Sequence, residues 1–188
     1  MSPALRRALW ACALALALVP LACPPPRPEA RPQLWLLGPF AELAAEVQWL
    51  RFHAAVTAGE EARALALAEE ALALDPRASA GWQSLAAHLV FDQASPALEP
   101  DPARRRTWFA AGLAVLSRGA AQAARPQELE FFRGLVLVTK AEDDPELDPG
   151  GARALRAAAV RAFERAAELG DARAAELLPQ ARAAAARE

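Results

Sequence analysis

The feature that most constrains the fold is a succession of alanine- and leucine-rich segments, separated by short stretches that contain glycine, proline or aspartate. Alanine makes up about a quarter of the 188 residues, aromatic residues only 6%, and tyrosine is absent. Alanine has the highest helix propensity and a small side chain, so this composition favours closely packed helices over sheets. We therefore expect an all-α protein with one domain of ordinary size and a targeting segment.

Helix-breaking residues divide the chain from Phe40 onward into seven expected helices. Gly59 separates the first two, and Asp75-Pro76 ends the second, because proline disfavours helical geometry in the residue before it. Asp101 followed by Pro102 is a favourable N-cap and first-turn pair for the fourth helix. The helices are expected at residues 40–58, 60–74, 79–91, 102–118, 127–140, 151–169 and 172–187. The short turns between them predict antiparallel helix pairs.

The stretch GEEARALALAEEALALDPRASAGWQSLA, residues 59–86, resembles the tetratricopeptide repeat signature. In that family, small residues let paired helices approach closely, and a tryptophan and a leucine fill the gap between them. The residues that carry the resemblance are Gly59, Ala64, Ala68, Ala71, Pro76, Trp82, Leu85 and Ala86. The stretch DQASPALEPD then reads as an insertion in the turn of the second repeat.

The C-terminal part carries a second resemblance. Ala159, Phe163 and Ala166 repeat the second-helix pattern, and AAELGDARAAELL is similar to the Sel1-like variant, with Gly170 as C-cap and Asp171 as the next N-cap. The resemblance implies a short tetratricopeptide-like α-solenoid over residues 34–188, built from three degenerate repeats and a terminal helix. Three units are about the minimum for a stable stack, because each buries its face only against a neighbour.

The resemblance to this family implies a binding surface for a protein partner. The first helix of each pair lines a concave groove in such arrays, which assigns to the groove Glu46, Trp49, His53, Val56, Gln83, Ala87 and Phe91. The first helix itself carries two apolar stripes on opposite sides, and one would suffice for packing on a single partner helix. The first stripe contains Leu43, Val47, Leu50 and Ala54, and the second contains Trp49, Phe52 and Val56. The second stripe either lines the groove or packs against Trp35, Leu36 and Leu37.

The N-terminus has the form of a secretory signal. Arg6 and Arg7 precede an uncharged run from residue 8 to Cys23, which is shorter than the roughly 20 apolar residues of a membrane-spanning helix and contains Pro20. Leu21, Ala22 and Cys23 resemble the lipobox of bacterial lipoproteins, which implies a signal peptide at residues 1–22 and a diacylglycerol on Cys23. Cleavage nearby by the general signal peptidase, or a retained membrane anchor, are the alternatives.

The sequence offers no disulfide partner for Cys23 in the mature chain. The only other cysteine, Cys12, lies in the apolar run that cleavage removes, so a disulfide is not expected. The proline-rich stretch PPPRPEARP follows Cys23 directly and favours an extended polyproline-like tether. Residues 23–33 are therefore interpreted as a lipidated cysteine and a spacer that holds the folded domain away from a membrane.

The chain offers no pattern that predicts a catalytic site, a metal site or a cofactor. His53 and His88 fall on different first helices, and the serines and threonines lack the context of an activated nucleophile. The acidic stretch AEDDPELDPGG is interpreted as a solvated turn, because Pro149 stands where a calcium loop needs its turn glycine. A net charge of −2 does not favour nucleic-acid binding.

Three consecutive arginines, Arg104, Arg105 and Arg106, lie in the first turn of an expected helix, where positive charge opposes the helix dipole. Either Glu99 and Asp101 compensate this charge locally, or an acidic partner or anionic lipid head group does. The sequence as a whole predicts an exported, lipid-anchored, tetratricopeptide-like adaptor or assembly factor that binds a protein partner in a bacterial cell envelope. The alternatives are a periplasmic enzyme of unfamiliar type and an inner-membrane protein that retains its leader.

Overall fold

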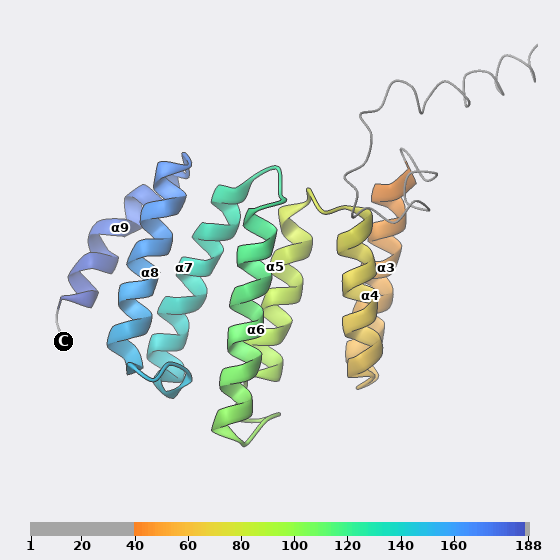
Figure 1. Cartoon of the computed structure of the whole chain (residues 1–188), viewed down its shortest axis with the longest axis horizontal. Coiled ribbons are helices and arrows are strands. Elements are labelled where there is room, and N and C mark those ends of the chain that lie inside the picture. The colour runs from red at the N-terminus through yellow and green to blue at the C-terminus, as the bar shows by residue number, and fades with distance from the viewer. Residues whose placement is uncertain (1–39, 187–188) are drawn as a thin grey trace, which may run out of the picture. The chain divides into compact units, whose positions relative to one another are not determined.

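The computed structural model describes residues 40–186, and this range is all-helical, as the sequence predicts (Figure 1). The expected signal peptide, Cys23, the tether and residues 34–39 lie outside the described residues. Neighbouring helices along the chain run in opposite directions and pack side by side (Figure 1). The α-helices are α3 (Ala41–Thr57), α4 (Glu61–Leu74), α5 (Ser79–Ala87), α6 (Pro102–Ala120), α7 (Pro126–Asp143), α8 (Gly151–Glu168) and α9 (Ala172–Ala185).

The helices begin and end close to the helix-breaking residues that the sequence analysis used. One expected helix, however, is not α-helical along its whole length. The expected third helix ends as an α-helix at Ala87 and continues as a π-helix, η2 (His88–Gln93), in which the amide of Ala94 donates to the carbonyl of Leu89 over 3.0 Å. Three consecutive residues from His88 to Val90 are buried there. A short 3-10 helix, η3 (Pro145–Leu147), occupies the acidic turn before α8.

The core consists of two clusters of buried side chains. The first joins α3, α4, α5, η2, α6 and α7, and the second joins η2, α6, α7, η3, α8 and α9. Trp108 of α6 and Phe132 of α7 pack against both clusters and connect them. Burying apolar area on both sides of the middle helices is the main stabilising contribution in a stack of this kind.

Small residues set the spacing between the helices. Ala64, Ala68 and Ala71 of α4 are fully buried, and Gly119 of α6 faces the indole ring of Trp82. A Cβ at Gly119 would lie 2.6 Å from a Trp82 ring carbon, closer than two carbons can approach. The close contact between α5 and α6 therefore requires glycine at this position.

Helix α3 packs on the core by the second of its two apolar stripes. Phe52 is buried in the first cluster, and Trp49 and Val56 pack against it as partly buried neighbours. The stripe with Leu43, Val47, Leu50 and Ala54 is exposed instead. The second stripe thus faces α4 and α5 and does not line an open groove. Its alternative packing against residues 35–37 stays a prediction, because those residues lie outside the described range. Within the described residues, no helix has the length and apolarity needed to cross a membrane.

Candidate interaction surfaces

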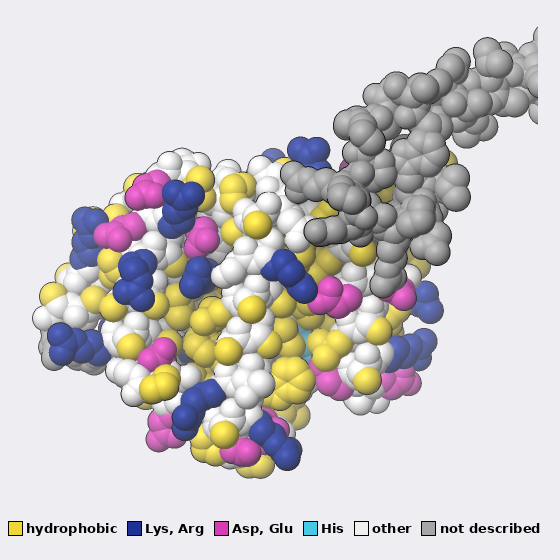
Figure 2. Space-filling model, viewed as in Figure 1, with side chains coloured by type: hydrophobic (Ala, Val, Ile, Leu, Met, Phe, Trp, Pro, Cys, Tyr) yellow, Lys and Arg dark blue, Asp and Glu magenta, His cyan; other side chains and the backbone are white. Residues whose placement is uncertain are grey.

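An apolar groove lies between α4 and α6, with α5 forming its floor. It has a volume of about 350 Å³ and is open to solvent, and Figure 2 shows hydrophobic side chains in the hollow between these helices. The ion pair of Glu69 and Arg118, with 2.7 Å between Oε1 and Nη2, joins α4 to α6 beside the apolar lining. The apolar residues that line the groove are Leu65, Leu85, Leu89, Trp108, Ala111, Ala114 and Val115. The sequence did not predict this groove, because its lining comes from α4, α5, η2 and α6, which are brought together only by the fold.

The residues predicted for the concave groove differ in their accessibility. Glu46, His53 and Phe91 are exposed, Trp49 and Val56 are half-buried against the core, and Gln83 and Ala87 are half-buried on α5 and its C-terminal end. Trp49 lies so close to Gly81 of α5 that a Cβ there would approach its ring to 2.8 Å. Trp49 therefore contributes more to α3–α5 packing than to an accessible surface.

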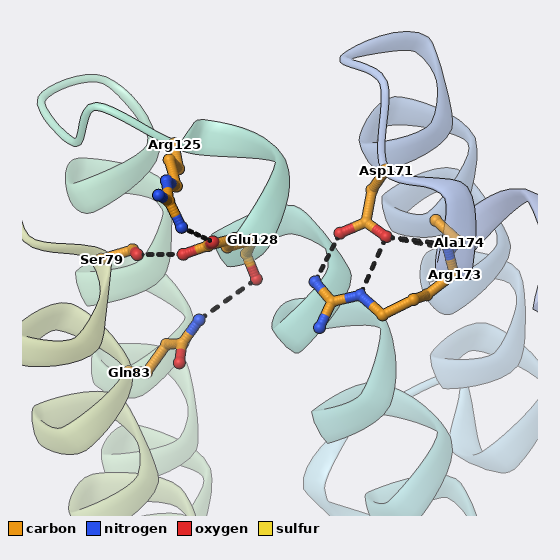
Figure 3. Close-up of polar contacts among 7 residues, drawn as sticks. All are labelled: Ser79, Gln83, Arg125, Glu128, Asp171, Arg173 and Ala174. Carbon is orange, nitrogen blue, oxygen red and sulfur yellow. Dashed lines mark hydrogen bonds and ion pairs between the residues drawn. The ribbon is translucent and has the colours of Figure 1, made fainter.

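Gln83 belongs to a polar cluster at the N-terminal ends of α5 and α7. Its side-chain amide donates to the backbone carbonyl of Glu128 over 3.3 Å, and the Glu128 carboxylate accepts from the Ser79 hydroxyl and from the guanidinium of Arg125 (Figure 3). These hydrogen bonds, that from Ser79 first, lower the pKa of Glu128. The cluster holds α5 against α7 and leaves Gln83 engaged within the chain.

A second cluster caps the last helix. The carboxylate of Asp171 accepts from the backbone amides of Arg173 and Ala174, over 3.0 and 3.3 Å, and from the Arg173 guanidinium (Figure 3). The Arg173 hydrogen bond is the main cause that lowers the pKa of Asp171. The same guanidinium lies 4.3 Å from the centre of the Phe131 ring on α7. Asp171 was predicted as this N-cap, and the prediction is confirmed.

The three consecutive arginines do not form one exposed patch. Arg105 is buried and forms an ion pair with Asp144, with 3.0 Å between Nε and Oδ2 and 3.3 Å between Nη2 and Oδ1. Arg104 is exposed and lies 3.8 Å from carboxylate oxygens of both Glu99 and Asp101. This is the local charge compensation that the sequence analysis gave as one alternative. Only Arg104 and Arg106 remain on the surface. The expected patch of three arginines for an anionic partner is therefore wrong for Arg105, which is buried.

Asp144 also changes the reading of the acidic turn. Its carboxylate is buried rather than solvated, because it pairs with Arg105 across the end of α6. Asp148 accepts a hydrogen bond from the amide of Gly150 over 2.7 Å, as a turn residue does. Across residues 40–186, no group of three or more histidine, cysteine or acidic side chains is arranged to hold a metal ion.

Two titratable side chains, Lys140 and His88, are buried in the fold, and the sequence assigned neither a role. Lys140, the only lysine, is buried with its ammonium 5.1 Å from the centre of the Phe91 ring, and burial lowers its pKa. His88 is buried with Nδ1 2.9 Å from Asp92 and Nε2 3.1 Å from Glu61. The Glu61 carboxylate also accepts from Gln93 over 2.7 Å, so this cluster ties α4 to the π-helix.

A smaller pocket of about 210 Å³ lies between α7 and α8 and is lined by Arg133, Arg161, Arg165 and Glu130, together with alanines. The Nε of Arg133 is buried without a hydrogen-bond partner, and its terminal nitrogen lies 3.7 Å from Glu130. Arg165 pairs with Glu168 at the surface.

Comparisons of the chain with protein-family models, with curated proteins and with solved structures found no match.

Proposed function

We propose that this protein is an exported, lipid-anchored adaptor or assembly factor that binds a protein partner in a bacterial cell envelope through a tetratricopeptide-like helical stack. The observation that carries the binding part of this proposal is the open apolar groove between α4 and α6. Apolar surface exposed in a concave groove favours association with a complementary apolar segment, because burial removes it from water. The leader, Cys23 and the proline-rich tether of the sequence support the anchoring part.

The tetratricopeptide-like part of the proposal rests on helix pairs and small residues. Ala64, Ala68 and Ala71 are the small positions of the repeat signature, and each is fully buried where α4 meets its neighbours. Trp82 and Leu85, the gap-filling positions, are buried in the first cluster. These contacts are of the kind that the signature implies.

The anchoring part is tested by the intact mass of the protein purified from its own membranes. We expect a chain that begins at Cys23 and carries added acyl mass, and we expect a Cys23→Ser variant to lack that mass, because only the thiol accepts the diacylglycerol. An unmodified wild-type chain that begins elsewhere would contradict lipid attachment. A chain that still begins at Met1 would instead support a retained membrane helix.

The binding part is tested by placing a photo-crosslinking amino acid at Trp108, in the groove, in cells that make the protein. We expect a discrete crosslinked protein partner from this position. The matched control is Ala110, which is exposed two residues further along α6 and does not line the groove. Equal crosslinking from both positions, or none from Trp108 while the chain remains helical by circular dichroism, would contradict a partner in this groove.

A further inference from the structure

Helix α3 presents an exposed apolar stripe on the side that faces away from the core. The exposed fraction is 65% for Phe40, 63% for Leu43, 47% for Val47 and 70% for Leu50. These four make up the majority of the seven large hydrophobic side chains exposed within residues 40–186. Their spacing, completed by the exposed Ala54, places them on one helix face.

This stripe has a physical cause in the position of α3 at one end of the described stack. An internal helix of a helical stack is apolar on two sides, because a neighbour covers each of them. Helix α3 has the same two-sided composition, with Phe52 buried on its inner side and the stripe on its outer side. Terminal units of such stacks otherwise carry a polar outer face, so the composition of α3 is that of a helix with a second neighbour.

We propose that the second neighbour is α3 of another copy of this protein, packed antiparallel about a two-fold axis. Within α3, four stripe residues are symmetric about the midpoint between Val47 and Leu50, so an antiparallel pair brings Val47 against Leu50 of the other copy and Leu43 against Ala54 of the other copy. Isologous packing requires this self-complementarity. Each helix then buries Leu43, Val47, Leu50 and Ala54 against the other.

The polar residues beside the stripe fit the same arrangement. Glu46 and His53 are seven residues apart, so they lie along the same side of the stripe, and both are exposed. An antiparallel pair places Glu46 near His53 of the other copy, where the carboxylate accepts a hydrogen bond from the imidazole. It also keeps Glu42 and Glu46 of one copy away from the same residues of the other, because the two N-terminal halves lie at opposite ends.

A membrane surface suits this face less well than a second copy does. Helices that lie in a bilayer interface carry lysine and arginine beside the apolar face, which attract anionic head groups. Beside the α3 stripe stand Glu42, Glu46 and one arginine, Arg51. The acidic side chains would be repelled by an anionic surface.

The test is disulfide crosslinking of the full-length chain in a background of Cys12→Ser and Cys23→Ser, which removes both natural cysteines and the lipid site. The double variant Glu46→Cys/His53→Cys is expected to form a covalent dimer on mild oxidation. Each single variant is expected to form little, because an antiparallel pair separates identical positions beyond the reach of a disulfide. Adding Leu50→Glu to the double variant is expected to abolish the dimer, whereas Ala62→Glu, at an exposed position of α4, is expected to leave it intact.

Other results would overturn the proposal. Single variants that crosslink as well as the double variant would show a parallel pair. A helical chain that stays monomeric with the single and the double cysteine variants would show that a second copy does not cover the stripe. Flotation with phosphatidylglycerol-containing vesicles would then separate the two remaining coverings. Flotation that Leu50→Glu abolishes would indicate a membrane, and no flotation would indicate the chain's own residues 34–37. Because this background lacks Cys23, the result does not depend on lipid attachment. It does not depend on the α4–α6 groove either, because no residue of α3 lines that groove.

Discussion

At the scale of single residues, Trp82 shows how one side chain defines the packing of a helix pair. Its side chain is 3% exposed, its indole N–H donates to the carbonyl of Pro76 over 2.9 Å, and Gly119 of α6 leaves room for the ring. The guanidinium of Arg118 lies 5.3 Å from the ring centre. The indole thus joins the turn before α5 to α6 by apolar packing and by one hydrogen bond.

Replacing Trp82 by alanine is expected to lower the free energy of unfolding by about 3–5 kcal/mol, because it removes a large buried ring and leaves a cavity. Trp82→Phe is expected to cost less, since it keeps most of the apolar volume and loses the hydrogen bond to Pro76. Urea unfolding followed by circular dichroism measures both. A loss below about 1 kcal/mol for Trp82→Ala would mean that the ring is not a packing residue.

Arg105 and Asp144 show that a charge run in the sequence does not define an exposed patch. The two residues are 39 positions apart, and the fold brings their side chains together in a buried ion pair. Burying either charge alone would cost a large desolvation free energy, and the ion pair offsets part of that cost for both side chains. The neighbouring Arg104 and Arg106 remain in solvent because the helix directs them to other sides.

At the scale of elements, Asp171 determines where α9 begins. Its carboxylate satisfies two of the amides that the first turn of a helix leaves without partners, and the lowered pKa of Asp171 reflects mainly the hydrogen bond from Arg173. Because the folded-state pKa lies below that of the unfolded chain, the ionised carboxylate stabilises the fold. This contribution is complete above the unfolded value of about 3.9 and is lost as the pH falls through the folded-state pKa.

Asp171→Asn is expected to destabilise the protein at neutral pH and to have a smaller effect in acid. Asparagine still caps a helix but cannot form the charged pair with Arg173, so the stability difference between the variant and the wild type should shrink as the pH falls below about 4. Urea unfolding at pH 7, 4.5 and 3 measures this difference. Glu176→Gln, an exposed change on the same helix, is the control, and a pH-independent difference for Asp171→Asn would contradict the role of its charge.

At the scale of the whole described stack, the two core clusters are connected through few side chains. Phe132 of α7 and Trp108 of α6 pack against both, whereas most other core residues belong to one cluster. In a stack of helix pairs, stability is a sum of unit and neighbour contributions, so cooperativity depends on such shared contacts. The wild-type chain is expected to unfold in one transition.

Phe132→Ala is expected to separate the unfolding of the two clusters. Trp82 lies within the first cluster and Trp49 packs against that cluster alone, whereas Trp108 contacts both clusters. With Trp10, Trp35 and Trp108 replaced by phenylalanine, tryptophan fluorescence therefore reports on the first cluster while circular dichroism reports on all helices. The two signals should coincide in this background and diverge when Phe132→Ala is added. Coincident transitions in the variant would show that the coupling runs through other contacts.

The sequence by itself determined the helices and their class. Alanine content, proline and glycine positions and N-cap residues act over a few neighbouring residues, so the limits of α4, the cap at Asp171 and the start of α6 at Pro102 were readable without tertiary information. The repeat signature likewise predicted Ala64, Ala68 and Trp82 as packing positions, and all three are buried.

Only the tertiary structure decided which faces are covered. Periodicity showed two apolar stripes on α3 but could not choose between them, because the choice depends on α4 and α5 as neighbours. The burial of Arg105 depends on Asp144, and the groove depends on the distance that the core leaves between α4 and α6. Local patterns set each helix, whereas contacts between residues distant in the chain set the surfaces available for binding, since burial is a property of the packed assembly.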